Sequence, residues 1–514
     1  MKHRALLVFV LLSCGSLVSA QEQFLVPSDN LILEGVPKVP RRLVDRVARY
    51  TDFREAKFAD WHPSKAEMLI LTRFADTSQV HQVTMPGGAR TQLTFEKDSI
   101  VGASYEPREG KYFVFRKSAG GNERYQLYRY DFDSGTITLL TDGKSRNSPP
   151  RWSRKSGRIA YTSTRRNGTD TDLYLMDPKD PKTDRLIHEF KGGGWAVLDW
   201  SPDDEQLLIG EYISINASHL YLYDLGRKTL TRISPASKEP VAYSGGQFTG
   251  DGKRIYTITD RGDEFRYLGK LSRQDGSLDR LWPTTATAHD VERFALTRDG
   301  KQLAVLVNDQ GVGRLHVIGK AAVPLPPGSV LDLHWHPDGK RLALVSASGQ
   351  SPPDIYVLDL DRQSVERWTR SETGGLVTAD FVEPKLIEWK SFDSHKITGF
   401  LYAPPARFQG KRPVILDIHG GPESQFRPRF LGRNNYYLKE MGIALIYPNV
   451  RGSSGFGKGF LTLDNGFKRE DSYKDIGALL DWIKGQPELD ADRVMVTGGS
   501  YGGHMTLAVA TYFP

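Results

Sequence analysis

The chain has 514 residues, a formal net charge of +7, and 39% hydrophobic and 25% charged residues. Its length exceeds the about 250–300 residues at which a single domain gives way to several, and its composition excludes a disordered or fibrous protein. The basic residues are spread along the sequence, which argues against a nucleic-acid-binding protein. After residue 20, no apolar stretch reaches the roughly 18 residues that would predict a membrane span.

The first 20 residues have the pattern of a secretory signal peptide. Residues 2–4 are basic, residues 5–12 are apolar, and residues 18–20 form a small-residue cleavage pattern. We therefore expect an exported protein, either periplasmic or secreted, whose mature chain begins with an N-terminal segment at 21–44. Cys14, the single cysteine, also lies in this stretch and is an alternative site for a lipid anchor.

A repeated unit fills the middle of the chain. Each unit has an aromatic or apolar residue, then a polar turn, then an alternating apolar strand, as in DWHPSKAEMLIL and HWHPDGKRLALV. A period of about 40–50 residues with strands and Asp-Gly turns is typical of β-propeller blades. We therefore predict a seven-bladed β-propeller over residues 45–382, in which the first residues of the units pack between blades. These residues recur 39 to 48 positions apart and are Trp61, Tyr105, Trp152, Trp200, Phe248, Leu296 and Trp335.

Two histidines in the last unit could be considered as metal ligands. His334 and His336 flank Trp335, but no third ligand is near them in the sequence. Because a zinc site needs at least three protein ligands, we predict no metal here. The sequence contains no cofactor motif either, and we expect none to be required.

The pattern changes from residue 383, where apolar strands begin to alternate with a helix. This order predicts a mainly parallel sheet in an α/β domain over residues 383–514. The expected elements are a hairpin at 386–405, strands at 414–418, 443–447 and 493–497, and an amphipathic helix at 471–485.

The segment Gly498-Gly499-Ser500-Tyr501-Gly502 has the G-x-S-x-G form of a nucleophile elbow. It follows an apolar strand and begins an apolar helix, which is the context that this motif requires. Ser500 is the predicted nucleophile, and the Tyr501 N–H is a predicted oxyanion donor. Gly498 and Gly502 would remove side chains that clash across the tight turn.

A second oxyanion donor is expected from the loop after an earlier strand. His419-Gly420-Gly421 has that place in the sequence and resembles the HGGG-type loops of lipases and esterases. Either a backbone N–H of this turn or the ring of His419 could donate. Alternatively, the glycines only close the loop.

Three motifs together resemble the prolyl oligopeptidase family of serine peptidases: HGGP at 419–422, YPNVRGSSGFG at 447–457 and GGSYGGH at 498–504. The HGGP form looks more like the acylaminoacyl-peptidase branch and its bacterial relatives. The resemblance implies a propeller ahead of an α/β-hydrolase domain and cleavage of short peptides between the two. It also implies Ser500 as the nucleophile, with Tyr501 and His419 forming the oxyanion hole.

The catalytic aspartate and histidine of that family follow the serine in a further segment. Two residues near Ser500 are poor substitutes, because His504 lies one turn along the same helix and Asp492 precedes the far end of the strand. We therefore expect a fragment or truncated product that is inactive alone, with these two residues in a missing C-terminal segment. The strand at 493–497 would then be an exposed sheet edge.

Two other functions remain open at this point. The same elbow and oxyanion loop would serve an esterase or another acyl hydrolase, and a truncated chain could be a non-catalytic propeller that binds peptides or proteins. Dipeptidyl peptidases of the family hold the substrate amine with a pair of glutamates, and this sequence has no adjacent pair. Asp263-Glu264 could bind an amino terminus, or it could be a solvated turn.

Overall fold

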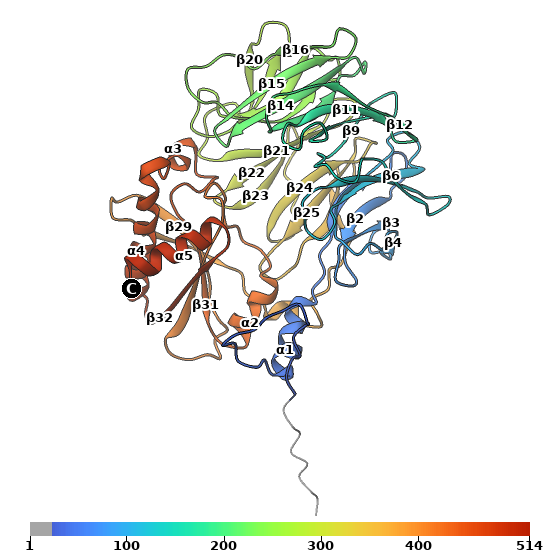
Figure 1. Ribbon diagram of the computed structural model, residues 1–514. Helices are drawn as coiled ribbons and strands as arrows, with labels where there is room; N and C mark the ends of the chain where they lie inside the picture. The colour runs from blue at the N-terminus through green and yellow to red at the C-terminus, as the bar shows by residue number, and fades with distance from the viewer. Residues whose placement is uncertain (1–22) are drawn as a thin grey trace, which may run out of the picture.

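The computed structural model describes residues 23–514 (Figure 1). The expected signal peptide and Cys14 lie outside the described residues. The first part of the described chain forms seven small antiparallel sheets, each made of consecutive strands, and the last part forms one mixed sheet flanked by helices. The prediction of a seven-bladed propeller followed by an α/β domain is therefore confirmed.

The first four blades contain β1 (Lys57–Trp61), β2 (Met68–Thr72), β3 (Gln79–Val83), β4 (Thr91–Gln92); β5 (Ile100–Tyr105), β6 (Tyr112–Lys117), β7 (Gln126–Asp131), β8 (Ile137–Leu139); β9 (Arg151–Trp152), β10 (Ile159–Ser163), β11 (Asp172–Asp177), β12 (Asp180–His188); β13 (Trp195–Trp200), β14 (Gln206–Ser214), β15 (Ala217–Asp224) and β16 (Thr229–Arg232). The last three contain β17 (Tyr243–Phe248), β18 (Arg254–Thr259), β19 (Tyr267–Ser272), β20 (Leu278–Trp282); β21 (Asp290–Leu296), β22 (Leu303–Asp309), β23 (Val312–Val317); β24 (Ser329–Trp335), β25 (Arg341–Ala347), β26 (Asp354–Asp359) and β27 (Ser364–Arg367).

The repeated aromatic residues join neighbouring blades, as predicted. Each one ends the first strand of its blade, and four indole N–H groups donate to the first strand of the preceding blade. Trp200, for example, is fully buried and donates to the carbonyl of Arg151 at 2.9 Å. Trp61 of the first blade donates to the carbonyl of His334 in the seventh at 3.1 Å. This hydrogen bond helps to close the ring between blades that exchange no strand.

Aspartates beside two of these residues add contacts in the opposite direction. The carboxylate of Asp60 accepts the amide of Tyr105 at 2.9 Å, and that of Asp199 accepts the amide of Phe248 at 2.8 Å. Each contact links the first strand of one blade to that of the next. Burial raises the pKa of Asp60 to about 6.

The second domain has a five-stranded sheet in the order β28-β29-β31-β30-β32. The strands β31, β30 and β32 run parallel, while β28 and β29 form the predicted antiparallel hairpin on one side. The sheet is thus less uniformly parallel than the alternating pattern predicted. The strands are β28 (Lys385–Lys390), β29 (Lys396–Tyr402), β30 (Arg412–Ile418), β31 (Ala444–Asn449) and β32 (Leu489–Gly498).

The strand β32 lies at an edge of the described sheet, as the sequence predicted. It begins four residues earlier than expected, because Leu489 already pairs with Arg412 of β30. Met495 near its middle is 50% exposed.

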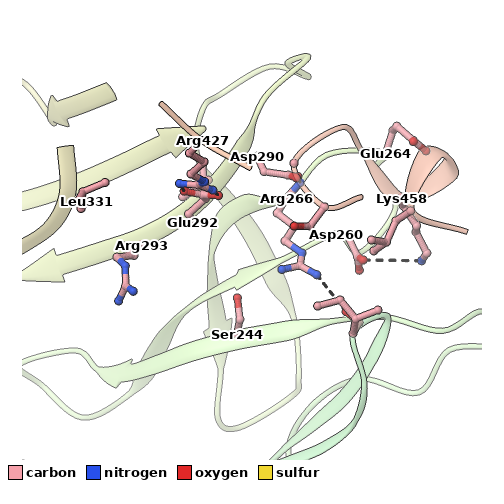
Figure 2. A pocket seen from close by; sticks show the side chains of 16 residues that line it. Ser244, Asp260, Glu264, Arg266, Asp290, Glu292, Arg293, Leu331, Arg427 and Lys458 are labelled. Atoms are coloured by element: carbon pink, nitrogen blue, oxygen red, sulfur yellow. Dashed lines mark hydrogen bonds and ion pairs between the residues drawn. The ribbon is translucent and has the colours of Figure 1, made fainter. Parts of the chain in front are cut away.

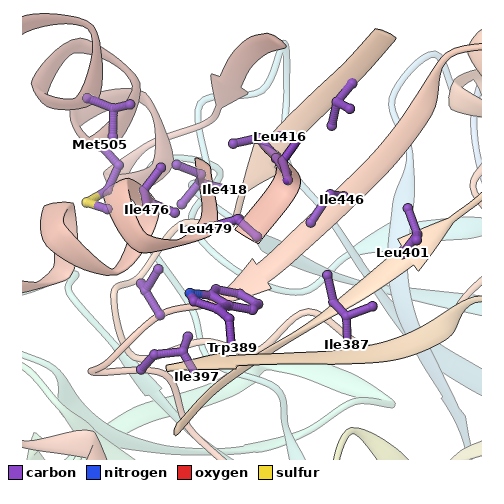
Figure 3. Packing of buried hydrophobic residues seen from close by; sticks show 14 of the residues in the cluster. Ile387, Trp389, Ile397, Leu401, Leu416, Ile418, Ile446, Ile476, Leu479 and Met505 are labelled. Carbon is purple, nitrogen blue, oxygen red and sulfur yellow. The ribbon is translucent and has the colours of Figure 1, made fainter. Parts of the chain in front are cut away.

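The helices and turns of the second domain surround this sheet. The predicted helix at 471–485 is α4, and the helix after Ser500 is α5. Both pack against the sheet through Ile476, Leu479 and Met505, which are fully buried around Trp389 (Figure 3). The elements are η1 (Thr378–Asp380), η2 (Gly432–Asn434), α2 (Asn435–Lys439), α3 (Lys458–Leu461), η3 (Gly466–Glu470), α4 (Asp471–Lys484) and α5 (Tyr501–Tyr512).

A helix before the first blade packs on the second domain. This helix, α1 (Arg41–Thr51), lies beside α2 in Figure 1. The Tyr50 hydroxyl donates to the carboxylate of Glu440 at 2.6 Å, Arg46 pairs with the same carboxylate at 3.0 Å, and the rings of Tyr50 and Tyr436 meet edge to face. Among the described helices, none combines the length and apolar character needed to cross a membrane.

Candidate active site

Three loops meet at the carboxyl ends of the parallel strands β30, β31 and β32. In the register of the sheet, Ile418 at the end of β30 pairs with Gly498 at the end of β32. The HGGP turn after β30 and the Ser500 turn after β32 therefore lie side by side. The carboxyl edge of a parallel sheet is where α/β enzymes place their reactive groups.

Ser500 occupies a strained turn between β32 and α5. Its φ of 55° and ψ of −121° place a non-glycine residue in a backbone region that L-residues rarely adopt. The residue is exposed to solvent. This is the geometry of a nucleophile elbow, in which the hydroxyl projects from the end of the strand.

The two flanking glycines are required by close backbone packing. A β-carbon at Gly502 would lie 1.9 Å from the carbonyl oxygen of Ile418, and one at Gly498 would lie 2.6 Å from the same atom. Both distances are far below any real contact. The steric reason given for these glycines from the sequence therefore applies in the fold.

Tyr501 is the first residue of α5, so its amide has no carbonyl acceptor within the helix. Such an amide at a helix N-terminus is suited to an oxyanion. The side chain is held away from this position by α4, because its hydroxyl hydrogen-bonds with Ser472 Oγ at 2.9 Å. The guanidinium of Arg469 also lies 5.1 Å from the Tyr501 ring centre.

The ring of His419 is occupied by contacts within the loops. Its Nδ1 lies 2.8 Å from the carbonyl of Gly420, and its Nε2 lies 2.9 Å from Ser453 Oγ. Burial lowers the pKa of His419, which favours the neutral ring. Both ring nitrogens are therefore engaged within the loops, Nδ1 by the Gly420 carbonyl and Nε2 by the Ser453 hydroxyl, which itself donates to the carbonyl of Val450 at 2.6 Å. In this conformation the ring has no N–H left for an oxyanion.

The backbone of the HGGP turn, in contrast, approaches the nucleophile directly. A β-carbon at Gly420 would lie 3.3 Å from the β-carbon of Ser500 and 3.2 Å from the carbonyl of Gly499. Of the two donors that the sequence left open, the geometry favours a backbone N–H of this turn over the His419 ring.

The two residues considered as substitutes for a missing base lie away from Ser500. His504 is exposed, and its Nε2 contacts the Tyr473 hydroxyl of α4 at 2.7 Å, which is a helix-packing contact. Asp492 is exposed near the start of β32. Within residues 23–514, no histidine or carboxylate forms a hydrogen bond with the Ser500 hydroxyl.

Arg451 fixes the loop after β31, a role that the sequence did not reveal. It is 2% exposed and pairs with the fully buried Asp475 of α4 at 2.7 Å. It also donates to Asp393 in the turn between β28 and β29 at 2.9 Å, and this contact lowers the pKa of Asp393 to about 2. One guanidinium thus connects three separate segments. Only contacts across the fold identify it.

A buried carboxylate lies behind the Tyr501 ring. Asp464 is fully buried and pairs with Arg469 at 2.6 Å, and burial raises its pKa to about 6. Gly452 is packed so closely that a β-carbon there would lie 2.3 Å from the Asp464 carboxyl group. Asp464 and Arg469 therefore support Tyr501 from the side of η3.

A cavity of about 460 Å³ lies between the two domains (Figure 2). Ser454, which follows the residue bonded to His419, lines it, so the cavity begins beside the HGGP turn. Its charged groups are balanced, and Arg427 and Glu292 form an ion pair across the domain boundary. Acids from the propeller and bases from both domains line it, namely Asp260, Glu264, Asp290, Glu292, Arg266, Arg293, Arg427 and Lys458.

The structure gives Asp263 and Glu264 specific partners. Asp263 pairs with Arg280 of its own blade. The Glu264 carboxylate accepts the amide of Gly459 at 2.6 Å, and its carbonyl accepts the amide of Lys458 at 2.9 Å. Glu264 thus holds α3 of the second domain against the propeller, a role that neither sequence interpretation included.

The two histidines of the seventh blade also have structural partners. The ring of His334 stacks on Phe58 with centres 4.5 Å apart and lies 3.2 Å from Asp332, while His336 contacts the carbonyl of Lys65 at 3.0 Å. In the part of the chain that the structure describes, no three potential metal ligands gather at one place.

Residues 428–514 match the sequence model of the prolyl oligopeptidase family. Uncharacterized peptidase YuxL of Bacillus subtilis is 23% identical over 528 aligned residues, which cover 79% of this chain and 78% of that protein. Dipeptidyl aminopeptidase BIII of Pseudoxanthomonas mexicana is 26% identical over 80% of this chain. The alignment spans 61% of that relative, which is less than two thirds of its length.

Solved structures agree on the arrangement of the domains. A prolyl endopeptidase superposes with a TM-score of 0.79 at 18% identity, covering 92% of this chain and 72% of the other. A puromycin hydrolase superposes with a TM-score of 0.75 at 18% identity, covering 90% and 76% of the two chains. These likenesses support the fold that the structure shows.

Proposed function

We propose that this chain is a serine peptidase of the prolyl oligopeptidase family, whose sequence model residues 428–514 match, and that Ser500 attacks the carbonyl carbon of short peptides and forms an acyl-enzyme. The observation that carries this proposal is the strained Ser500 turn beside the amide of Tyr501 at the start of α5. The amide would stabilise the oxyanion of the tetrahedral intermediate, together with a backbone N–H of the turn at 419–421.

Peptide hydrolysis also needs a base that takes the proton of the serine hydroxyl. We propose that a histidine oriented by an aspartate takes this proton, a role that neither His504 nor Asp492 fills in the described residues. The catalytic triad of the family supports this part of the proposal. Without such a base the hydroxyl of Ser500 would be a weak nucleophile.

Short peptides are the proposed substrates because the loop after β31, which contacts His419 through Ser453, lines the cavity between the domains. The cavity of about 460 Å³ is bounded by the propeller on one side. A space of this size suits a few residues of extended peptide and excludes a folded protein.

The test uses protein purified from its natural source, with its intact mass measured first. We expect a peptidyl diphenyl phosphonate to label the natural protein at Ser500, and the Ser500→Ala variant to remain unlabelled. Hydrolysis of peptide amides well above that of matched acyl esters would favour a peptidase over an esterase. Equal labelling of the parent and the Ser500→Ala variant would contradict the role of Ser500.

We also propose that the protein is exported. The basic, apolar and small-residue pattern of its first 20 residues supports this proposal. N-terminal sequencing of the natural protein should find a start at residue 21, or a modified Cys14 if the chain is lipid-anchored. A mature protein that retains Met1 would contradict export by cleavage.

A further inference from the structure

A second cavity lies between the domains, beside the one described above. It has a volume of about 620 Å³, and Leu331 and Arg427 line both cavities. The two spaces therefore adjoin at Arg427 and its ion pair with Glu292. The second cavity is bounded by the end of α1, by blades 1 and 7 and by the segment 425–434.

The charges of this second cavity differ from those of the first. Four arginines line it, and its one acid, Glu55, pairs with Lys57 at 2.7 Å. Arg427 is neutralised by Glu292. The remaining three arginines therefore give the cavity its positive charge. They are Arg73, Arg429 and Arg433.

These three arginines have no carboxylate within 4.0 Å among residues 23–514. Arg73 donates to main-chain carbonyls, including that of Phe53 at 3.1 Å. The guanidinium of Arg429 lies 4.9 Å from the ring centre of Phe426. Arg429 and Arg433 are both exposed. Their donors can therefore serve a ligand without first breaking an ion pair.

The charges of two of these arginines also affect the pKa of an aspartate outside the cavity, Asp417. Burial raises the pKa of Asp417 on β30, and the charges of Arg429 and Arg433 oppose this rise. Asp417 does not line either cavity. The cavity side of Arg429 and Arg433 thus faces only one acid, Glu55, which already has a cationic partner.

The loop that carries Arg429 and Arg433 follows β30 and begins beside Ser500. Gly420 packs against Ser500, and five residues later Gln425 lines the second cavity. Gln425 is fixed by a hydrogen bond that its side-chain oxygen accepts from Asn308 of blade 6 at 2.7 Å. The second cavity is therefore joined to the nucleophile turn by one short segment of the chain.

We propose that the second cavity binds a carboxylate of a short peptide through Arg429 and Arg433. This inference rests on the proposed peptidase function and adds a preference within it. Arginine suits this task because its planar donors match a carboxylate and remain charged at every physiological pH. The apolar lining around Phe53 and Phe430 would strengthen the attraction by excluding water. The carboxylate could be the C-terminus of the peptide or an acidic side chain.

The test measures equilibrium binding by calorimetry, with Ser500→Ala present in every protein to prevent turnover. Three pentapeptides are compared. Two share one sequence and differ only in ending as a free acid or as an amide. The third is the amide with one aspartate in place of an asparagine. We expect the free acid to bind about tenfold or more tightly than the plain amide. Tight binding of the aspartate amide would show that a side-chain carboxylate also serves, and weak binding would restrict the site to the C-terminus.

The paired substitution Arg429→Gln with Arg433→Gln should reduce binding of the free acid to the level of the amide. It should leave binding of the amide unchanged. The control is Arg185→Gln on β12, an exposed arginine of the propeller, which should alter neither. Added salt should narrow the difference between acid and amide, because it screens exposed charges.

Two results would overturn the proposal in different ways. If acid and amide bind equally, or if the paired substitution weakens both by the same factor, the carboxylate site is wrong and the peptidase function stands. If none of the three peptides binds to folded protein, both the site and the short-peptide function are contradicted. The comparison of acid with amide in the unsubstituted cavity decides the question even if the paired variant fails to fold.

Discussion

Replacing Gly502 by alanine tests whether the nucleophile turn depends on direct packing between α5 and β30. The added β-carbon would lie 1.9 Å from the carbonyl oxygen of Ile418, whereas ordinary contact begins at 3.4 Å. The two backbones would have to separate by about 1.5 Å. A misplacement of ~1 Å at a reacting group can cost about 100-fold in rate. We also expect a loss of about 1–3 kcal/mol in the free energy of unfolding, which is typical of overpacking.

The assay is the rate of phosphonate labelling at Ser500, with the urea midpoint measured on the same samples. Gly503→Ala is the matched control, because its β-carbon would meet only the Gly498 carbonyl at an ordinary 3.4 Å. Alanine is a better helix former than glycine, so the control should be neutral or up to ~1 kcal/mol more stable. If Gly502→Ala is labelled as fast as the parent, or if both alanines slow labelling equally, the packing argument is wrong.

Three further changes test the parts of the fold that support this site. Trp61→Phe removes the hydrogen bond to His334 that joins the first and last blades, and should cost about 1–3 kcal/mol in the free energy of unfolding. Asp464 has a pKa of about 6, raised by burial, so the folded state binds its proton more readily than the unfolded state. Stability should therefore increase as the pH falls from about 6 towards 4, and Asp464→Asn should remove this part of the pH dependence. Arg451→Met leaves Asp475 buried without its cation and should cost about 3–5 kcal/mol.

For each of these three predictions, one outcome would contradict the reasoning. The propeller argument fails if Trp61→Phe unfolds at the parent's urea concentration. The charge argument at Asp464 fails if the asparagine variant keeps the parent's slope of stability against pH between 4 and 6. For the third change, the double variant Arg451→Met with Asp475→Leu removes both charges and should recover part of the loss. A double variant less stable than Arg451→Met alone would contradict an unpaired charge as the cause.

The features that the sequence predicted correctly are those fixed by local chemistry. A blade is one short unit, so the residue that packs at the end of its first strand recurs at a regular interval, as Trp152 and Trp200 do. The Ser500 turn depends on residues two positions away on either side, and both glycines are visible in the motif. Patterns of this kind need no knowledge of what lies across the fold.

The features that the sequence missed depend on partners far away in the chain. Arg451 contacts Asp393, which is 58 residues earlier, and no local pattern links the two. Glu264 lies in a polar turn that looks solvated, yet it meets Gly459 of the other domain at a distance of 195 residues in sequence. The carboxylate-binding cavity is likewise formed by α1, two blades and one loop, none of which indicates a site alone.

The contact between α1 and the second domain makes the propeller an insertion. Tyr50 and Glu440 are hydrogen-bonded although 390 positions separate them, and the whole propeller lies between. At ~5–20 residues per second, ribosomal synthesis of that interval takes about 20–80 seconds. Throughout that time the N-terminal helix lacks the surface on which it packs. Docking of α1 is therefore a late event in assembly, and protection of α1 from proteolysis would report that it has met the second domain.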